Sequence, residues 1–301
     1  MPDGALAKGL EQLAAMKDHV LQLDSALSQL AKTSGLSAAE LKNITEEAFR
    51  MGDAAGESGA QVLSCIASAH RAGYDIRQSM ALAEEALKMS SLSFGMDDAA
   101  DAVSRLNTIL DSFGESADFA SSINDGLAAV AGSGPADFDT LAQGMAALSE
   151  SASCAGLSFE ETLGLLSGAY AVLKDMDQVA GGEPAIFSML KESYGSAGDV
   201  YGILDELSGV WNTLDAPARE TFAISNAGDA QKEVFAALMD NWAGVESAVS
   251  SAQDSVGAAD QASALCLDSL SAKTAVFQNK VAQLSAALMD SGILRFFLDL
   301  G

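Results

Sequence analysis

Histidine and cysteine are the residues of this sequence best suited to hold a metal or to act as nucleophiles. There are two histidines, His19 and His70, and three cysteines, Cys65, Cys154 and Cys266. A catalytic zinc needs two or three nitrogen or sulfur ligands at helical or hairpin spacing. No second ligand lies near His19, and Cys65 precedes His70 by five positions, which does not bring the pair to one helix face. We therefore expect no metal and no cofactor. The cysteines are odd in number and far apart, so they predict no disulfide framework and indicate a reducing compartment or thiols without a role.

Adjacent acids are the next candidates, as the general acid and base of a hydrolase. Two-carboxylate hydrolysis needs acids that face each other across a cleft. Neighbouring helical residues instead point about 100° apart. Several of these acids would also stand in first turns, where the helix dipole favours negative charge. They therefore predict solvated helix surface; the pairs are Glu46-Glu47, Glu84-Glu85, Asp97-Asp98 and Glu160-Glu161.

The motifs of calcium, nucleophile and phosphate sites are all incomplete. Asp175 and Asp177 begin like a calcium loop, but the next ligand position is Val179. The run Gly195-Ser196-Ala197-Gly198 lacks the preceding strand and the glycine spacing of a nucleophile elbow. No glycine-rich loop precedes Lys273-Thr274. We therefore expect no catalytic residues and no enzyme.

The charge balance bears on the partners of the chain. Forty-two acidic against 16 basic residues give a net charge of −26, which argues against binding a nucleic-acid backbone or anionic lipid. Trp211 and Trp242 are expected to be core anchors and not base-stacking platforms, because basic residues do not surround them. No apolar run approaches the roughly 18–20 residues of a membrane span. The start of the chain also lacks the pattern of a signal peptide, so we expect a soluble chain.

Apolar spacing predicts an all-α fold, a multi-helix array of short antiparallel helices. Residues 1–34 are expected to form an N-terminal amphipathic helix, because leucines and other apolar residues recur there in steps of three and four. Residues 35–258 are expected to form one continuous helical core. Its predicted helix starts are Ser37 with Glu40, Asp75 with Gln78, and Ser158 with Glu161, each after a glycine that can end the preceding helix.

Proline-containing runs predict further helix ends within this core. Each combines a helix stop with a proline suited to a turn or to a first helical turn. None of them is long enough to be a flexible linker between domains. The runs are Gly132-Ser133-Gly134-Pro135, Gly181-Gly182-Glu183-Pro184 and Asp215-Ala216-Pro217.

Residues 259–301 differ from the rest because they carry a heptad pattern followed by an apolar tail. Alternating steps of three and four predict a long C-terminal helix that pairs with another helix in a coiled coil. The tail must dock on some surface, since it would otherwise expose an apolar patch. The alternative is that both pieces pack on this chain's own body. The candidate residues are Leu267, Leu270, Phe277, Val281, Leu284 and Leu288 for helix pairing, and Phe296 and Phe297 for docking.

From about Leu36 to Gly301 the chain resembles the helical core region of the tape measure proteins of long-tailed phages and prophages. The passage Ala155–Leu163, AGLSFEETL, resembles the family's "AGVSFEE" helix start. Asp199–Trp211, DVYGILDELSGVW, is similar to "YDILxxLSxxW". Val234–Trp242 and Leu267–Gly301 also resemble family passages, the latter the ending "LDSIxGKxxxLxxxxxxLxxxxxDSDLxKxxxDLG". The shared order of four passages makes the resemblance specific.

The resemblance implies a structural virion component that sets tail tube length, occupies the tube lumen and leaves before DNA passes. The implied partners are copies of itself, the tail tube protein and tail assembly chaperones, with assembly in the host cytoplasm. Where the family is usually more basic, this chain has Asn226–Gln231, and the family usually continues beyond Gly301. A fully helical chain of this length would span at most roughly 450 Å. We therefore expect one region of a ruler or a prophage remnant.

Two other function classes stay open at this stage. One is a non-viral amphipathic helical interaction protein that binds lipid or a partner, although the acidic balance disfavours anionic membranes. The other is a muralytic tail enzyme, which would need a glutamate in an apolar pocket or a zinc site. The sequence indicates neither of these sites.

Overall fold

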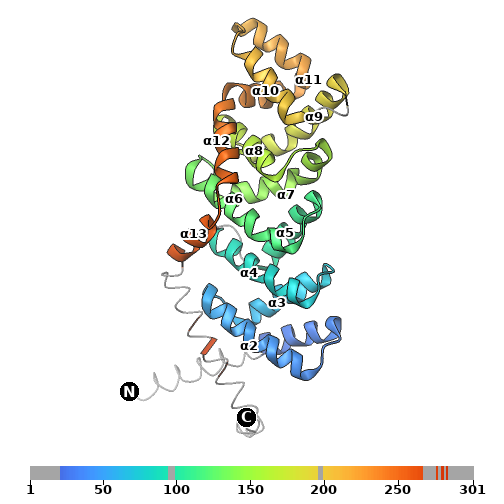
Figure 1. Ribbon diagram of the computed structural model, residues 1–301, viewed down its shortest axis with the longest axis vertical. Coiled ribbons are helices and arrows are strands. Elements are labelled where there is room, and N and C mark those ends of the chain that lie inside the picture. The colour runs from blue at the N-terminus through green and yellow to red at the C-terminus, as the bar shows by residue number, and fades with distance from the viewer. Residues whose placement is uncertain are drawn as a thin grey trace, which may run out of the picture. The chain divides into compact units, whose positions relative to one another are not determined.

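The computed structural model describes residues 21–93, 99–195 and 199–266, together with residues 276, 279, 280 and 283. Within these ranges the regular structure is helical throughout, which confirms the predicted all-α class (Figure 1). Residues 21–34 are helical. The elements that follow are α2 (Ala38–Ala55), α3 (Gly59–Arg71), α4 (Ile76–Leu92), α5 (Ala99–Phe113), the short 3₁₀ helix η1 (Ala117–Phe119), α6 (Ala120–Ser133), α7 (Phe138–Ala155), α8 (Phe159–Leu173), α9 (Met176–Tyr194), α10 (Val200–Trp211), α11 (Ala216–Asp240), α12 (Trp242–Gln253) and α13 (Ala258–Cys266).

The chain divides into two compact units. Unit 1 comprises Met1–Ser91, Asp97–Val103 and Ser263–Gly301, and unit 2 comprises Leu92–Met96 and Ser104–Ala262. The predicted organisation, with boundaries after residues 34 and 258, is a division of another kind and stays a prediction.

The predicted helix starts are confirmed. Ser37 and Glu40 form a capping box at α2, and Ser158 and Glu161 form a second one at α8. In the α8 box the Ser158 hydroxyl accepts from the Glu161 N–H at 3.1 Å, and the Ser158 N–H donates to Glu161 Oε2 at 2.8 Å. Gly156, with φ +89°, ends α7 in the left-handed conformation. The same reciprocal pair of bonds joins Asp75 and Gln78.

One predicted helix end is wrong. Gly134 follows the end of α6 and Asp215 caps α11, as expected, but Gly181–Pro184 lies inside α9. A proline removes one backbone hydrogen bond from a helix interior. In α9 that loss is offset by packing, because α9 contacts α7, α8, α10 and α11.

Unit 1 is built from the helix at 21–34 with α2, α3 and α4. The core side chains Leu30, Leu63 and Leu82 are completely buried. Helices α2 and α3 approach closely, since a Cβ atom at Gly59 would lie 2.6 Å from the Phe49 ring. This contact fixes the turn between the two helices, where the Asn279 side chain is bound.

Helix α8 is the centre of unit 2. It contacts α6, α7, α9, α11 and α12. Apolar residues surround its axis, and Leu163, Leu165 and Leu166 are completely buried. A helix that is apolar on all sides must be covered on all sides, so the other helices of the unit are arranged around it.

Glycines let α12 approach α8 closely (Figure 1). A Cβ atom at Gly164 would overlap the Val249 side chain and lie 3.0 Å from the Val245 carbonyl oxygen. One at Gly168 would overlap the Val245 side chain and lie 3.3 Å from its Cα. Valine is stiff at χ1, and backbone atoms cannot swing aside. The contact therefore depends on the absence of a side chain at both positions.

We predict that Gly168→Ala lowers the free energy of unfolding of unit 2 by about 1–3 kcal/mol, the usual effect of overpacking. The matched control is Gly181→Ala, which has no atom within 4 Å of its added Cβ and should stabilise α9 by up to about 1 kcal/mol. Both tryptophans of the chain lie in unit 2, so denaturation followed by tryptophan fluorescence measures this unit. Equal effects of the two substitutions would contradict the close contact.

Candidate functional site

The residues predicted to pair helices all lie outside the part of the chain that the structure describes. Their role therefore stays a prediction. They are Leu267, Leu270, Phe277, Val281, Leu284, Leu288, Phe296 and Phe297.

Four neighbouring residues of the same segment are described, and they are helical. Among them Asn279 is only 1% exposed, because its side chain is bound at the turn between α2 and α3. Its Oδ1 accepts from the Gly59 N–H at 2.9 Å. Its Nδ2 donates to the Glu57 carbonyl oxygen at 2.6 Å and to Asp53 Oδ1 at 3.0 Å. Sequence analysis missed Asn279, because a single asparagine between apolar heptad positions carries no signal of burial.

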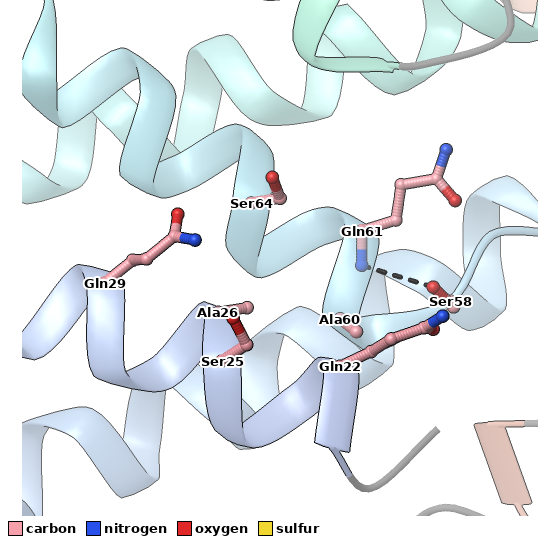
Figure 2. A pocket seen from close by; sticks show the side chains of 8 residues that line it. All are labelled: Gln22, Ser25, Ala26, Gln29, Ser58, Ala60, Gln61 and Ser64. Atoms are coloured by element: carbon pink, nitrogen blue, oxygen red, sulfur yellow. Dashed lines mark hydrogen bonds between the residues drawn. The ribbon is translucent and has the colours of Figure 1, made fainter. Parts of the chain in front are cut away.

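A second feature of unit 1 is a polar groove of about 450 Å³ between the helix at 21–34 and the first turns of α3. Figure 2 shows Gln22, Ser25 and Gln29 on the first helix, and Gln61 and Ser64 on α3. The Ser58 hydroxyl in this groove is used by α3 itself, as it accepts from the Gln61 N–H at 3.2 Å. The lining side chains are uncharged, so the groove offers amides and hydroxyls but no acid–base pair; it is lined by Gln22, Ser25, Ala26, Gln29, Ser58, Ala60, Gln61 and Ser64.

Glu183 is the most perturbed acid among the described residues. It is completely buried within α9, and neither of its carboxylate oxygens has a hydrogen-bond partner. Burial raises the pKa of the Glu183 carboxyl well above its usual range. A glycosidase acid also has a raised pKa, and sequence analysis did not single out Glu183 as such an acid. Because its exposed fraction is zero, however, the carboxyl does not reach a substrate in this state.

The two tryptophans are core anchors, as predicted. The Trp211 Nε1–H donates to Asp240 Oδ1 at 2.8 Å, and the Trp242 Nε1–H donates to Asp205 Oδ1 at 2.8 Å. These two bonds run in opposite directions between α10 and the junction of α11 with α12. One basic group does lie beside Trp211, since the Arg219 guanidinium is 5.0 Å from its ring centroid. Trp211 is nevertheless buried and not free to stack on bases.

The residues best suited to bind metal do not cluster where the structure describes them. Within those ranges, no group of three or more histidine, cysteine or acidic residues is placed to hold an ion. The His70 side chain bonds to the backbone just after the end of α3, with Nδ1 2.8 Å from the Tyr74 carbonyl oxygen. His19 lies outside the described residues. None of the described helices is both long enough and apolar enough to cross a membrane.

Comparison with known proteins places the chain among tail proteins. A family model described as phage-related minor tail protein matches residues 45–261, well over half of the chain. No solved structure matches the chain. Three of the four passages that carry the resemblance lie inside the matched range, and the passage at 267–301 lies beyond it.

We predict that Glu183 makes unit 2 less stable as the pH rises. Its folded pKa exceeds its unfolded value, so between these two values the folded chain holds more protons than the unfolded chain, and stability falls with increasing pH. Glu183→Gln removes this dependence. As the pH rises from 5 to 8, the free energy of unfolding of the variant should therefore increase relative to that of the wild type. The expected difference is more than roughly 1 kcal/mol, given the cost of burying a carboxylate.

The control for this prediction is Glu192→Gln, which makes the same change on the exposed surface of α9. It should follow the wild type at every pH in urea denaturation monitored by tryptophan fluorescence. If Glu183→Gln also followed the wild type, the buried carboxyl would have no effect on stability.

Proposed function

Because residues 45–261 match its family model, the chain belongs to the phage-related minor tail protein family, and we propose that it is a tape measure region. In this role it helps to set the length of the tail tube and occupies the tube lumen until DNA passes. The role is structural and not enzymatic. The protein would be a component of the virion tail, assembled in the host cytoplasm.

The family match is the observation that carries this proposal. The finer assignment, from minor tail protein to tape measure, is supported by the order of the four passages that resemble tape measures. It is also supported by the helical architecture, since a helix rises about 1.5 Å per residue and converts chain length directly into distance.

The proposed partners are copies of the same chain, the tail tube protein and tail assembly chaperones. Pairing between copies would use the heptad positions from Leu267 to Leu288, with Phe296 and Phe297 docking the tail. The net charge of −26 suits a lumen component, because like charges prevent the protein from trapping DNA in the tube.

A change in the length of this region should change the length of the tail. Deletion of residues 104–262 from the tail gene of the phage, which removes 159 residues, should shorten the tube by up to about 240 Å at 1.5 Å per residue. A tandem duplication of the same residues is the matched control and should lengthen it by the same amount. Electron micrographs that show assembled tails of unchanged length in both phages would refute the proposal that this region sets tail length.

Charges in the predicted seam should disrupt pairing. We expect Phe277→Asp combined with Leu284→Asp to reduce the oligomer mass of the full chain in light scattering, because a charge at a or d positions opposes burial. The control is Gln283→Glu, an acidic change at an exposed position of the same segment. An oligomer mass and melting behaviour identical to the wild type would count against a pairing seam.

The chain should not bind duplex DNA tightly. In a mobility-shift assay at about 50 mM salt, where electrostatic binding is strongest, we expect no retained complex at micromolar protein. Tight, salt-dependent binding would show that the chain has a basic surface despite its negative net charge. It would contradict the proposal that this charge keeps the protein from trapping DNA.

A further inference from the structure

The turn between α2 and α3 presents three polar groups that converge on one point. The Gly59 N–H is a donor in the first turn of α3, where backbone N–H groups have no partner within the helix. The Glu57 carbonyl oxygen and the Asp53 carboxylate are acceptors. One donor beside two acceptors matches a primary amide, which offers one oxygen and two N–H groups. A carboxylate or an ammonium group would leave at least one of the three without a bond.

Asn279 supplies this amide, and its side chain is almost completely buried at the turn. The receiving side is shaped for it as well. A Cβ atom at Gly52 would lie 3.2 Å from Asn279 Nδ2 and 2.6 Å from the Glu57 carbonyl oxygen, so a larger residue would narrow the site. More than 200 residues separate Asn279 from Gly59, and the contact therefore brings a distant part of the chain onto these helices.

The neighbouring ion pair adds little to this contact. Lys280 Nζ lies 3.5 Å from Asp53 Oδ2, and the lysine side chain is 65% exposed. Exposed pairs of this kind contribute weakly to stability. The specificity of the contact lies in the amide of Asn279.

The position of Asn279 in the heptad pattern determines which face of the segment is bound. The steps of the pattern make Leu267 position a and Leu270 position d, which makes Phe277 position d and Asn279 position f. On a helix, position f lies about 170° from the centre of the a and d positions. Position f normally faces solvent in a coiled coil, yet here it is buried.

We propose that the α2–α3 turn is the docking site for the f face of this chain's own C-terminal segment, anchored by Asn279, and that the opposite face of this segment binds a second copy of the chain. The second part rests on the proposed self-association. The two faces of the segment therefore make two different interactions. The f face docks within one chain through Asn279, and the seam at positions a and d pairs between chains.

If the two faces act independently, docking can be lost without loss of pairing, and pairing without loss of docking. In the full chain, Asn279→Asp keeps the shape of the side chain but places a carboxylate beside Asp53 and the Glu57 carbonyl oxygen. The repulsion from these two acceptors should release the segment from the turn, so we expect the Gly59 amide to exchange with solvent at least roughly tenfold faster. The oligomer mass should not change. Asn279→Ala, which leaves the Gly59 N–H without an acceptor, should give the same result.

Phe277→Asp combined with Leu284→Asp should give the converse result, a lower oligomer mass with wild-type exchange at Gly59. The matched control for Asn279→Asp is Gln283→Glu, the same amide-to-acid change at an exposed position of the segment, and it should alter neither measurement. Hydrogen exchange by NMR measures the docking, and light scattering measures the pairing.

The outcomes distinguish the two parts. Unchanged Gly59 exchange in both Asn279 variants would overturn the docking site. Loss of oligomer mass in those variants, or fast Gly59 exchange in the seam variant, would overturn the separation of the faces. A wild-type chain that is monomeric at all concentrations would overturn the proposed self-association, while Gly59 exchange would still test the docking.

Discussion

The close approach of α12 to α8 is the constraint on which unit 2 depends. Gly164 and Gly168 leave space for Val245 and Val249, and a side chain at either glycine would overlap a valine. Glycine in a helix interior costs up to about 1 kcal/mol relative to alanine, so these positions sacrifice local helix stability for a contact between distant helices. The same solution recurs at Gly182 of α9, where a Cβ atom would lie 2.8 Å from a methyl group of Val234 in α11.

Local features of the fold could be predicted from the sequence, because they depend on residues three or four apart. The capping box of Ser158 and Glu161 is an example, since both partners and the preceding Gly156 stand within six positions. The helix end predicted at Gly181–Pro184 is absent, because helices from elsewhere in the chain pack on α9 there. A proline run predicts a helix end only where no such packing offsets the lost hydrogen bond.

The buried polar residues mark the limit of sequence analysis at the site. Nothing adjacent to Glu183 or Asn279 indicates that either is buried, because the residues that cover them come from other helices. Asn279 reached its partners across more than 200 residues, and its amide satisfies backbone groups at the start of α3. Glu183 has no such partners. One buried group therefore specifies a contact, whereas the other makes the unit sensitive to pH.

The chain belongs to a phage tail family and has a helical fold and an acidic charge balance. The proposed tape measure role adds that it acts through its length, in the lumen of the tail tube. Cryo-electron microscopy of the phage before and after DNA release tests this most directly, with an antibody-detectable tag in the chain to identify it in purified tails. A tape measure in the lumen predicts helical density along the tube before release and an empty or DNA-filled lumen without the tag afterwards. A tag retained on the outer surface of the tube in both states would contradict it.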